Sequence, residues 1–544
     1  MNLGIDKALC LKLGYVVVTS QSVGISKEVV LICKCLRELL KCSSTNRLRS
    51  FRHVGATELI PLLIQIWTNV IQSKIEKECR SSEFDDGLIS IVRVLRVYSK
   101  LIPAKSYLIN YLQGSFLGQL LCDILLWIND PSSSILYSSP AVLWESLGLL
   151  KDLTFRLRID DKKILMFLEG EILFGILSAS FERIKGFHPR FQEWCTAVIW
   201  NLVLDPPICQ NLLSKTMGDG KQVGIVIVNG LLQVLIQHST SCKNSGLSLK
   251  IKRNATSALG NIISDSKNHT FLFQNRCETK LSALIPQLVC SAQDDSDPVI
   301  RRRAMRTIRC LAGSMDIGVK NFVQNGNLPS FLIDIISQKG MHEDENYHDM
   351  LIQACQTVIA LKESINAEVW CQVQVALLQR IEDTTCTNVI PAAALCLSTS
   401  MSKNPISRGP SCFSAKFWNN LERLVSTSSK VHAAVSDLLV AIAKMENHSG
   451  SIEAQELGNP SILTKTPVIN TLTTILLESE SGKEDARNQA LEVVLILSEN
   501  GSNKRLLAGN ERLLSGLVTL CLMQPDSEIK DSAKRIILQL VPEI

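Results

Sequence analysis

Apolar residues recur at helical spacing along most of the 544-residue chain. In residues 298–312, Ile300, Ala304, Ile308 and Leu311 are three or four positions apart, so they lie on one face of a helix that turns about 100° per residue. Polar stretches rich in glycine, proline, serine and asparagine separate such segments and mark loops. These stretches lie near residues 72–87, 217–224, 239–248, 402–416 and 446–466. The pattern predicts an all-α protein whose helices are joined by loops.

One arrangement returns along the chain: an apolar helix end, a polar turn containing asparagine, an apolar pair and a new helix. It is clearest in residues 35–67, 258–289, 308–336 and 495–522. Aligning the apolar pair that closes each long helix gives eleven anchors, about fifty residues apart on average. The anchors are Leu36, Leu95, Leu150, Ile199, Leu259, Ile308, Val358, Ala394, Leu439, Val494 and Ile537. Such a period is typical of helical solenoids, so we expect one domain over residues 1–544, built from about eleven units.

Two groups of residues carry a resemblance to a known family. One group precedes ELIPLL and the other precedes RLLSGLV: Asn46, Arg47, Phe51, Gly55 and Ala56, and Asn503, Leu506, Leu507 and Gly509. These segments resemble armadillo repeats, the three-helix units of β-catenin and importin α. The segment that runs from Asp297 and Pro298 to Arg301 has HEAT-like character. The resemblance implies a right-handed α-solenoid of armadillo/HEAT-like repeats, whose concave surface binds extended peptides or partner proteins.

Composition narrows the class of protein. Hydrophobic residues make up 46% of the chain and charged residues 20%, which is too much apolar material and too little charge for a disordered protein. Aromatic residues account for only 5%, which suits helices packed on helices. The formal net charge of +5 is small for this length and argues against a dedicated nucleic-acid-binding protein. Any basic binding site must therefore be local.

The sequence predicts a protein of the cytoplasm, the nucleus or both. Its first residues contain no basic region followed by a sustained hydrophobic core, as a secretory signal would. Its most apolar windows are interrupted before the roughly 20 residues needed to cross a bilayer. Many of the 18 cysteines stand singly among apolar residues, as do Cys122, Cys195, Cys310, Cys355 and Cys521. Free thiols in such places behave as small hydrophobes, so we expect a reducing compartment and no membrane insertion.

Motifs for catalysis are missing from the sequence, so we expect no enzyme and no cofactor. GDGK at 218–221 lacks the spacing of a phosphate-binding loop, and no serine stands in a G-x-S-x-G elbow. Cys33 and Cys35 form a pair without a second pair at zinc spacing. The segment HEDENYHD at 342–349 contains two histidines and several acidic residues, which together could hold a divalent ion. A solvated loop is the simpler interpretation.

Two asparagines are candidates for contacting a bound peptide. In armadillo proteins the third helix of each unit lines the concave face, and in importin α that helix presents a tryptophan and, four residues later, an asparagine. Asn201 and Asn261 match the asparagine, whereas Ala197 and Ser257 stand where the tryptophan would be. The resemblance therefore implies a contact to a peptide backbone and argues against a receptor for basic import signals. A hydrogen bond to a neighbouring unit is the alternative for each amide, and both interpretations stay open.

Five arginines fall within nine positions of SDPVIRRRAMRTIRCLA, residues 296–312. Arg302, Arg306 and Arg309 are spaced so that they lie opposite the apolar stripe of the helix. Arg301 follows Asp297 by one turn, a favourable order of acid before base. We therefore expect Arg301 to have a structural role within its own helix.

The remaining arginines are candidates for binding an anionic partner. If the family orientation holds, Arg303 and Arg306 face the concave groove, and Arg253 of the preceding unit aligns with Arg302. A solvated face is the most economical interpretation of this basic strip, because exposed arginine rows are common. An acidic protein segment comes second, and nucleic acid is disfavoured by the lack of interleaved aromatic residues.

The function expected from the sequence is that of a non-catalytic scaffold or adaptor, which captures a partner segment, acidic by hypothesis, along a concave groove. The residues assigned to this groove are Arg303, Arg306, Arg302, Arg309, Arg253, Asn201 and Asn261. Three alternatives remain open: a nuclear import adaptor, a regulatory subunit of an exchange factor or ubiquitin-ligase assembly, and a purely structural part of a larger assembly. The missing tryptophan array counts against the first of them.

Overall fold

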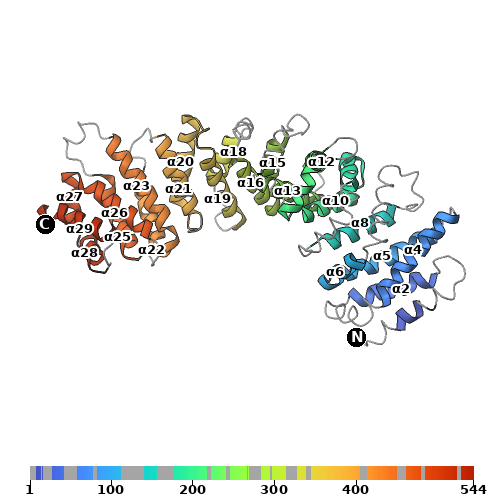
Figure 1. The fold of residues 1–544 in the computed structure, drawn as a ribbon. Helices are drawn as coiled ribbons and strands as arrows, with labels where there is room; N and C mark the ends of the chain where they lie inside the picture. The colour runs from blue at the N-terminus through green and yellow to red at the C-terminus, as the bar shows by residue number, and fades with distance from the viewer. Residues whose placement is uncertain are drawn as a thin grey trace. The chain divides into compact units, whose positions relative to one another are not determined.

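The structure is a computed structural model of the chain, drawn in Figure 1. It describes residues 8–13, 15, 27–41, 58–77, 82–111, 140–155, 175–216, 222–239, 246–265, 267–268, 283–293, 297–313, 328–338, 345–404, 413–449, 461–478, 484–523 and 528–543. Apart from an isolated bridge between Thr216 and Gln222, these residues form helices, turns and connecting segments. The predicted all-α class is confirmed.

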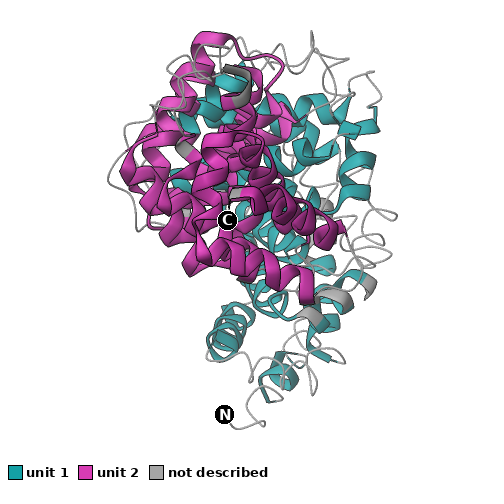
Figure 2. Cartoon of the chain, turned by 90° about the vertical axis from the view of Figure 1, so that its left-hand side faces the viewer, with its two compact units in different colours: residues 1–291 teal, residues 292–544 magenta. Residues whose placement is uncertain are grey.

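The chain divides into two compact units, residues 1–291 and residues 292–544, which Figure 2 shows in different colours. The division falls within α15 (Leu284–Gln293). The single domain expected over residues 1–544 stays a prediction.

In unit 1, five long helices each contact the next one along the chain and form what we call the third-helix layer of unit 1. They are α2 (Lys27–Lys41), α5 (Ser82–Tyr98), α8 (Pro140–Thr154), α10 (Pro189–Leu202) and α13 (Gly246–Ser264). The other described elements of this unit are α4 (Ile60–Lys77), α6 (Ile102–Tyr111), η2 (Ile184–Gly186), α11 (Pro206–Ser214) and α12 (Val223–Ser239). Of these, α4 packs on α5 and α12 packs on α13.

Unit 2 has two layers, in each of which every helix contacts the next. Its third-helix layer contains α16 (Pro298–Ala312), α19 (Glu345–Ala360), α21 (Ile390–Lys403), α23 (His432–Ser449), α26 (Glu484–Ser498) and α29 (Glu528–Leu540). The second layer contains α18 (Leu328–Ser337), α20 (Ala367–Asp383), α22 (Ala415–Thr427), α25 (Thr466–Glu478) and α28 (Glu511–Met523). The short elements are η5 (Ser429–Val431), η6 (Ile462–Thr464), α27 (Gly501–Ala508) and η7 (Val541–Glu543). Contacts between successive neighbours are the mark of a solenoid.

Each of the eleven anchors read from the sequence lies in a separate helix of the two third-helix layers. Ten of them are buried; at the last one Ile537 is half-exposed and its neighbour Ile536 is the buried member of the pair. Even Ala394, which follows the shortest gap, is fully buried in α21. The predicted repeat of about eleven units is confirmed.

Residues at the polar turns fix where several helices begin. Asp297 caps α16, because its Oδ1 accepts hydrogen bonds from the backbone N–H groups of Val299 at 2.9 Å and Ile300 at 3.4 Å. Pro298 follows at the first helical position, where no donor is needed. Asn366 and Ser414 cap α20 and α22 in the same way. These local signals explain why a leucine-rich chain breaks into many short helices.

The expected loop inserts and the residues of the family resemblance can be compared with the structure. The insert expected at 72–87 is shorter than the sequence suggested, because α4 continues to Lys77 and α5 begins at Ser82. The other four expected inserts lie across gaps between successive helices. Of the residues that carried the family resemblance, those from 46 to 56 lie outside the described part of the chain. Asn503 and Leu507 are buried, and Leu506 is exposed.

The cysteines that the sequence places singly among apolar residues are buried or half-buried where the structure describes them. Cys195 and Cys355 are buried, Cys310 and Cys521 are half-buried, and Cys122 lies outside the described residues. Burial raises the pKa of the Cys195 thiol to about 12, which keeps this thiol protonated and unreactive at neutral pH.

Candidate partner-binding surfaces

The third-helix layer of unit 1 contains a cleft of about 370 Å³ that combines basic and aromatic side chains. We call it the basic–aromatic cleft. Four helices, α5, α8, α10 and α13, contribute its walls: Arg93, Arg96, Ala141, Trp144, Glu145, Lys151, Arg190, Glu193, Trp194, Leu247 and Lys250. Sequence reasoning did not single out this set.

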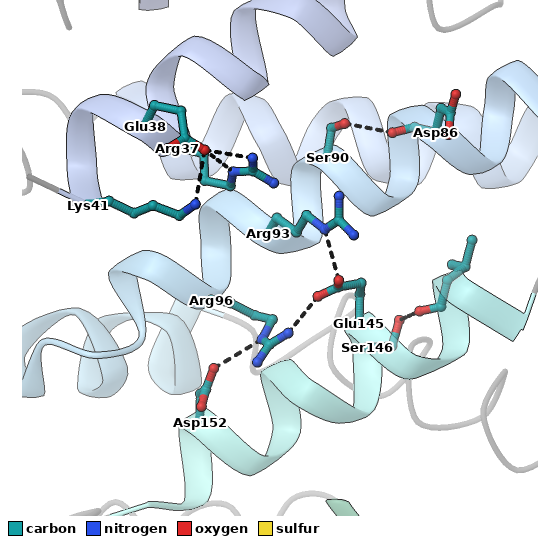
Figure 3. Close-up of polar contacts among 11 residues, drawn as sticks. Arg37, Glu38, Lys41, Asp86, Ser90, Arg93, Arg96, Glu145, Ser146 and Asp152 are labelled. Carbon is teal, nitrogen blue, oxygen red and sulfur yellow. Dashed lines mark hydrogen bonds and ion pairs between the residues drawn. The ribbon is translucent and has the colours of Figure 1, made fainter. Parts of the chain in front are cut away.

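Carboxylates of α8 hold two arginines of α5 in place on one side of this cleft (Figure 3). Glu145 accepts from Arg93 Nε at 2.8 Å and from Arg96 Nη1 at 2.5 Å, while Asp152 accepts from Arg96 Nε at 3.0 Å. Burial by itself would lower the pKa of Arg96, but the charges of Asp152 and Glu145 outweigh it and raise that pKa. The Arg96 guanidinium is thus fixed between two carboxylates and permanently charged.

The other cations of the cleft differ in their partners. Lys151 pairs with Glu193 at 2.6 Å. Arg190 and Lys250 are exposed, and no carboxylate of the described residues forms an ion pair with either of them. The cleft and its ion pairs contain five cationic side chains and three carboxylates, which leaves two positive charges without compensation. The cleft is therefore suited to an anion.

Two tryptophans supply flat apolar surface beside these charges. The Arg190 guanidinium lies 5.9 Å from the centre of the Trp144 ring, and that of Arg96 lies 5.9 Å from the Trp194 ring. Trp194 precedes Asn201 by seven residues, two turns earlier on the same face of α10. The sequence contains this spacing of seven residues. Because a tryptophan was expected four residues before the asparagine, Trp194 was not predicted.

The two candidate asparagines differ in the structure. Asn201 is buried, and its Nδ2 donates to the Lys151 carbonyl oxygen at 3.4 Å and to Thr154 Oγ1 at 3.2 Å, both in α8. That amide therefore joins two neighbouring helices. Asn261 is half-buried, and its buried Nδ2 has no hydrogen-bond partner among the described residues. The amide of Asn261 thus lacks the inter-helix bonds that Asn201 makes, but its Nδ2 is not exposed to a ligand.

The arginines of α16 split into three environments. Arg301 is 7% exposed, while the carboxylate of Asp297, its expected partner, accepts from backbone N–H groups. Arg302 pairs with Asp349 of α19 at 3.3 Å, and Arg309 donates to Gln356 of the same helix at 2.9 Å.

Arg306 is exposed and Arg303 is half-buried, so these two side chains remain accessible at the surface of α16. Arg253, on α13 in the other unit, is also exposed. The arginine row expected from the sequence is thus partly engaged with α19, and the binding role of its members stays a prediction.

Of the acidic and histidine-rich segment 342–349, residues 345–349 belong to α19, which begins at Glu345, and residues 342–344 lie outside the described part of the chain. Asp349 is engaged with Arg302, and His348 Nδ1 lies 3.4 Å from Cys386 Sγ. Among the described residues no group of three or more metal-ligating side chains comes together. The described helices also include none that is long and apolar enough to cross a membrane.

A buried polar network braces the helices that carry the cleft. His238 of α12 lies between Gln192 of α10, with Nε2 at 2.7 Å from Oε1, and Ser248 of α13, with Nδ1 at 3.0 Å from Oγ. Gln192 Nε2 donates to the Ile184 carbonyl oxygen, so its Oε1 accepts and His238 Nε2 carries the proton. Burial, reinforced by the charge of Lys252, lowers the pKa of His238 and keeps the imidazole neutral.

This network makes part of the stability dependent on pH. An unfolded histidine takes up a proton below a pKa of about 6.5, whereas folded His238 resists protonation until lower pH. The folded state is therefore expected to lose stability as pH falls from 7 to 5. His238→Gln should be less stable than the wild type at pH 8, with a smaller gap between the two at pH 5. Thermal unfolding at both pH values measures this gap, and a gap that does not change with pH would contradict the assignment.

Comparisons with known proteins identify the fold. No family model matches the chain, and no curated protein matches it. Among solved structures, one from a study of the phosphorylation switch that controls the interaction between cadherin and β-catenin is 14% identical. It has a TM-score of 0.56 and covers 98% of this chain and 90% of its own.

Two further structures match over almost the whole length. The structure of SYS-1 is 11% identical with a TM-score of 0.52, and that of an engineered protein is 14% identical with a TM-score of 0.51. Each covers 99% of both chains. At such low identity these matches concern the fold alone, and together with the helical layers they show that this protein is an armadillo-like α-solenoid.

Proposed function

We propose that this protein is a non-catalytic scaffold that binds an acidic segment of a partner protein in the basic–aromatic cleft of unit 1. The observation that supports this proposal is the presence of Arg190 and Lys250 in that cleft without a carboxylate partner among the described residues. An acidic side chain that entered the cleft would supply the missing counter-charge. The sequence located a basic surface on α16, and the structure adds the cleft, which we take as the main site.

The ion pairs of the cleft prepare it for such a ligand. Arg96 is held by Glu145 and Asp152, so its side chain loses little conformational entropy when a ligand binds beside it. Trp144 and Trp194 line the cleft, with His188 stacked on the Trp144 ring at 4.7 Å, and their remaining exposed ring surface gives apolar parts of a ligand a place to pack, which strengthens the ionic contacts. A short segment that combines acidic and apolar side chains fits this chemistry best.

The candidates from the sequence take supporting roles in the same proposal. Arg303 and Arg306 form a second basic surface, on unit 2, and Arg302 and Arg309 contribute to it while they bond α19. Arg253 adds charge on α13. The contact expected from Asn261 to a ligand backbone requires its side chain to turn outward, because its Nδ2 is buried. Asn201 acts indirectly, since its amide joins α10 to α8. An import adaptor for basic signals is less compatible with a cleft that carries excess positive charge.

Charge reversal in the cleft tests the proposal. The probe is a fluorescein-labelled peptide of twelve residues with glutamate and leucine in alternating pairs, and its binding to the intact protein is followed by fluorescence anisotropy. The double substitution Arg190→Glu and Lys250→Glu is expected to weaken binding at least tenfold, a loss of about 1.4 kcal/mol. Arg303→Glu with Arg306→Glu is the corresponding test of the second basic surface.

A matched control distinguishes the effect of lost contacts in the cleft on affinity from the effect of a changed net charge. Lys362→Glu with Lys430→Glu changes the charge equally at exposed positions of unit 2, and it should leave affinity within about twofold. A cleft variant that binds as tightly as the wild type would refute the proposal. Tighter binding of a lysine-rich peptide than of the acidic one would instead favour the import adaptor.

A further inference from the structure

A groove of about 670 Å³ lies between α21 and α23 in the third-helix layer of unit 2. Leu395, Met401, Val440, Ala441 and Met445 make most of its surface apolar. Leu395 is 44% exposed, so a ligand can reach its side chain. We call this the α21–α23 groove. It shares no residue with the basic–aromatic cleft, which belongs to unit 1.

The hydroxyl groups along this groove are turned to their own helix. Ser398 and Thr399 donate to the Leu395 carbonyl oxygen at 3.0 and 2.8 Å, and Ser402 donates to the Thr399 carbonyl oxygen at 2.8 Å. The remaining cation, Lys444, pairs with Glu492 of α26 at 2.8 Å. The hydroxyl groups are thus committed to their own helix, and among the lining residues Lys444 alone, at one end of the groove, keeps spare N–H donors for a ligand.

This scarcity of donors over the apolar part of the groove favours one backbone conformation for a segment that covers it. An extended segment would bring carbonyl groups against an apolar surface without partners, and each such group costs roughly 1–3 kcal/mol when it is buried unsatisfied. In a helix the backbone groups bond one another, so only side chains meet the groove. An amphipathic helix can thus bury apolar area here without that penalty.

The spacing of the lining residues also fits a helix. On α21 they stand at Leu395, Thr399 and Ser402, and on α23 at Asp437, Val440 and Lys444. Both rows advance by three or four residues per step, which is one turn of about 5.4 Å. A third helix lying along them places its own side chains at i, i+4 and i+7 between these turns.

Charge at one end of the groove sets the direction of such a helix. Asp437 accepts a hydrogen bond from the neutral amide of Gln489, and no cation of the described residues forms an ion pair with its carboxylate. At the other end, the charges of Lys444 and Glu492 offset each other. A helix N-terminus carries partial positive charge, and basic residues in its first turn add to it. The N-terminus of the ligand helix therefore belongs beside Asp437.

From these contacts we propose that the α21–α23 groove binds an amphipathic helix of a partner protein, two to three turns long, with its basic N-terminal turn at Asp437. This helix site is independent of the acidic segment proposed for the cleft. The two sites can be lost separately, because variants of one leave the residues of the other unchanged.

Selection from a displayed library of random sixteen-residue peptides tests this inference on the intact protein. Peptides are selected on the wild type and counter-selected on Leu395→Lys, an exposed position at which folding is preserved. The recovered sequences are expected to repeat apolar residues at i, i+4 and i+7 and to carry lysine or arginine in the first turn. One synthetic winner should become helical on binding, as seen by circular dichroism, and should lose at least tenfold in affinity with Ala441→Glu and with Asp437→Lys.

Val375→Lys provides the matched control, because Val375 is 64% exposed on α20 in the other layer and its replacement should leave affinity within twofold. The inference would be overturned if no recovered peptide depended on Leu395. It would also be overturned if the recovered peptides showed period-two or proline-rich patterns. Self-association of the wild type that Leu395→Lys abolishes would also overturn it, since the occupant would then be a second copy of this chain. Binding of the acidic probe to the cleft is unaffected by either result.

Discussion

Replacing Arg380 by methionine is expected to lower the free energy of unfolding by about 3 kcal/mol. Arg380 lies in α20, is 5% exposed, and donates from Nε to the Ile336 carbonyl oxygen at 3.0 Å and from Nη2 to the Gln338 carbonyl oxygen. Both carbonyl groups lie at the C-terminal end of α18, where a helix leaves acceptors unsatisfied and carries partial negative charge. Methionine fills similar volume but removes the charge and the donors, so the carbonyl oxygen of buried Ile336 loses its side-chain donor and that of Gln338 keeps only the Tyr347 hydroxyl, at 3.0 Å.

Tyr347 completes the same site and gives the prediction a graded test. Its hydroxyl donates to the Ile335 carbonyl oxygen at 2.8 Å and accepts from Arg380 Nη2 at 2.8 Å, and the guanidinium lies 5.5 Å from the ring centre. Tyr347→Phe should cost about 1 kcal/mol, since one hydrogen-bonding group is lost and the ring stays. Urea unfolding followed by circular dichroism, with hydrogen exchange at α18 and α20, measures both effects.

Arg512→Met serves as the control for the loss of an arginine. Arg512 is exposed on α28, so its replacement should change stability by less than about 0.5 kcal/mol. Equal effects of Arg380→Met and Arg512→Met would contradict the role assigned to Arg380.

Gly230→Ala is expected to destabilise unit 1 by about 2 kcal/mol, although alanine normally favours a helix interior by up to about 1 kcal/mol. A Cβ atom at Gly230 in α12 would lie 2.6 Å from Phe181 Cδ1 and 2.9 Å from the Phe181 backbone oxygen. Phe181 is fully buried, so neither its ring nor its backbone can move without disturbing the packing around it. The close approach of these two segments requires glycine.

Gly516→Ala is the matched control for this substitution. At Gly516, in the interior of α28, the nearest atoms to an added Cβ belong to Leu477 at 3.6 Å, an ordinary contact. This variant should be as stable as the wild type or more stable by up to about 1 kcal/mol. Thermal unfolding of both variants measures the contrast, and a stabilising Gly230→Ala would show that α12 is not packed as closely as described.

Local patterns were sufficient to predict the helices and their repeat. The stripe of Ile300, Ala304, Ile308 and Leu311 is buried as expected, because helical periodicity depends only on residues within a few turns. The turn at Asp297 and Pro298 was predictable for the same reason, since a cap acts on the next three residues. Ile537 shows the limit of this approach: both members of an apolar pair match the pattern, and only packing decides which one is buried.

The candidate sites depended on contacts that no local pattern records. Arg93 and Glu145 are 52 positions apart, and their pairing follows from the packing of α5 on α8. The same packing directs the Asn201 amide into α8, a use that the sequence could offer only as one of two alternatives. Arg302 and Arg309 were placed correctly on the side opposite the core stripe, yet their bonds to Asp349 and Gln356 required the position of α19.

The sequence by itself determined the all-α class, the eleven anchors and the turns between helices, because each of these is specified by residues close together in the chain. Tertiary structure decided which charges are compensated and which side chains share a cleft or a groove. Arg190 and Lys250 line a cleft only because their helices pack beside α5 and α8. Leu395 lines a groove only because α21 packs beside α23. In a solenoid each helix is coded locally, whereas its binding surfaces are assembled from units about fifty residues apart.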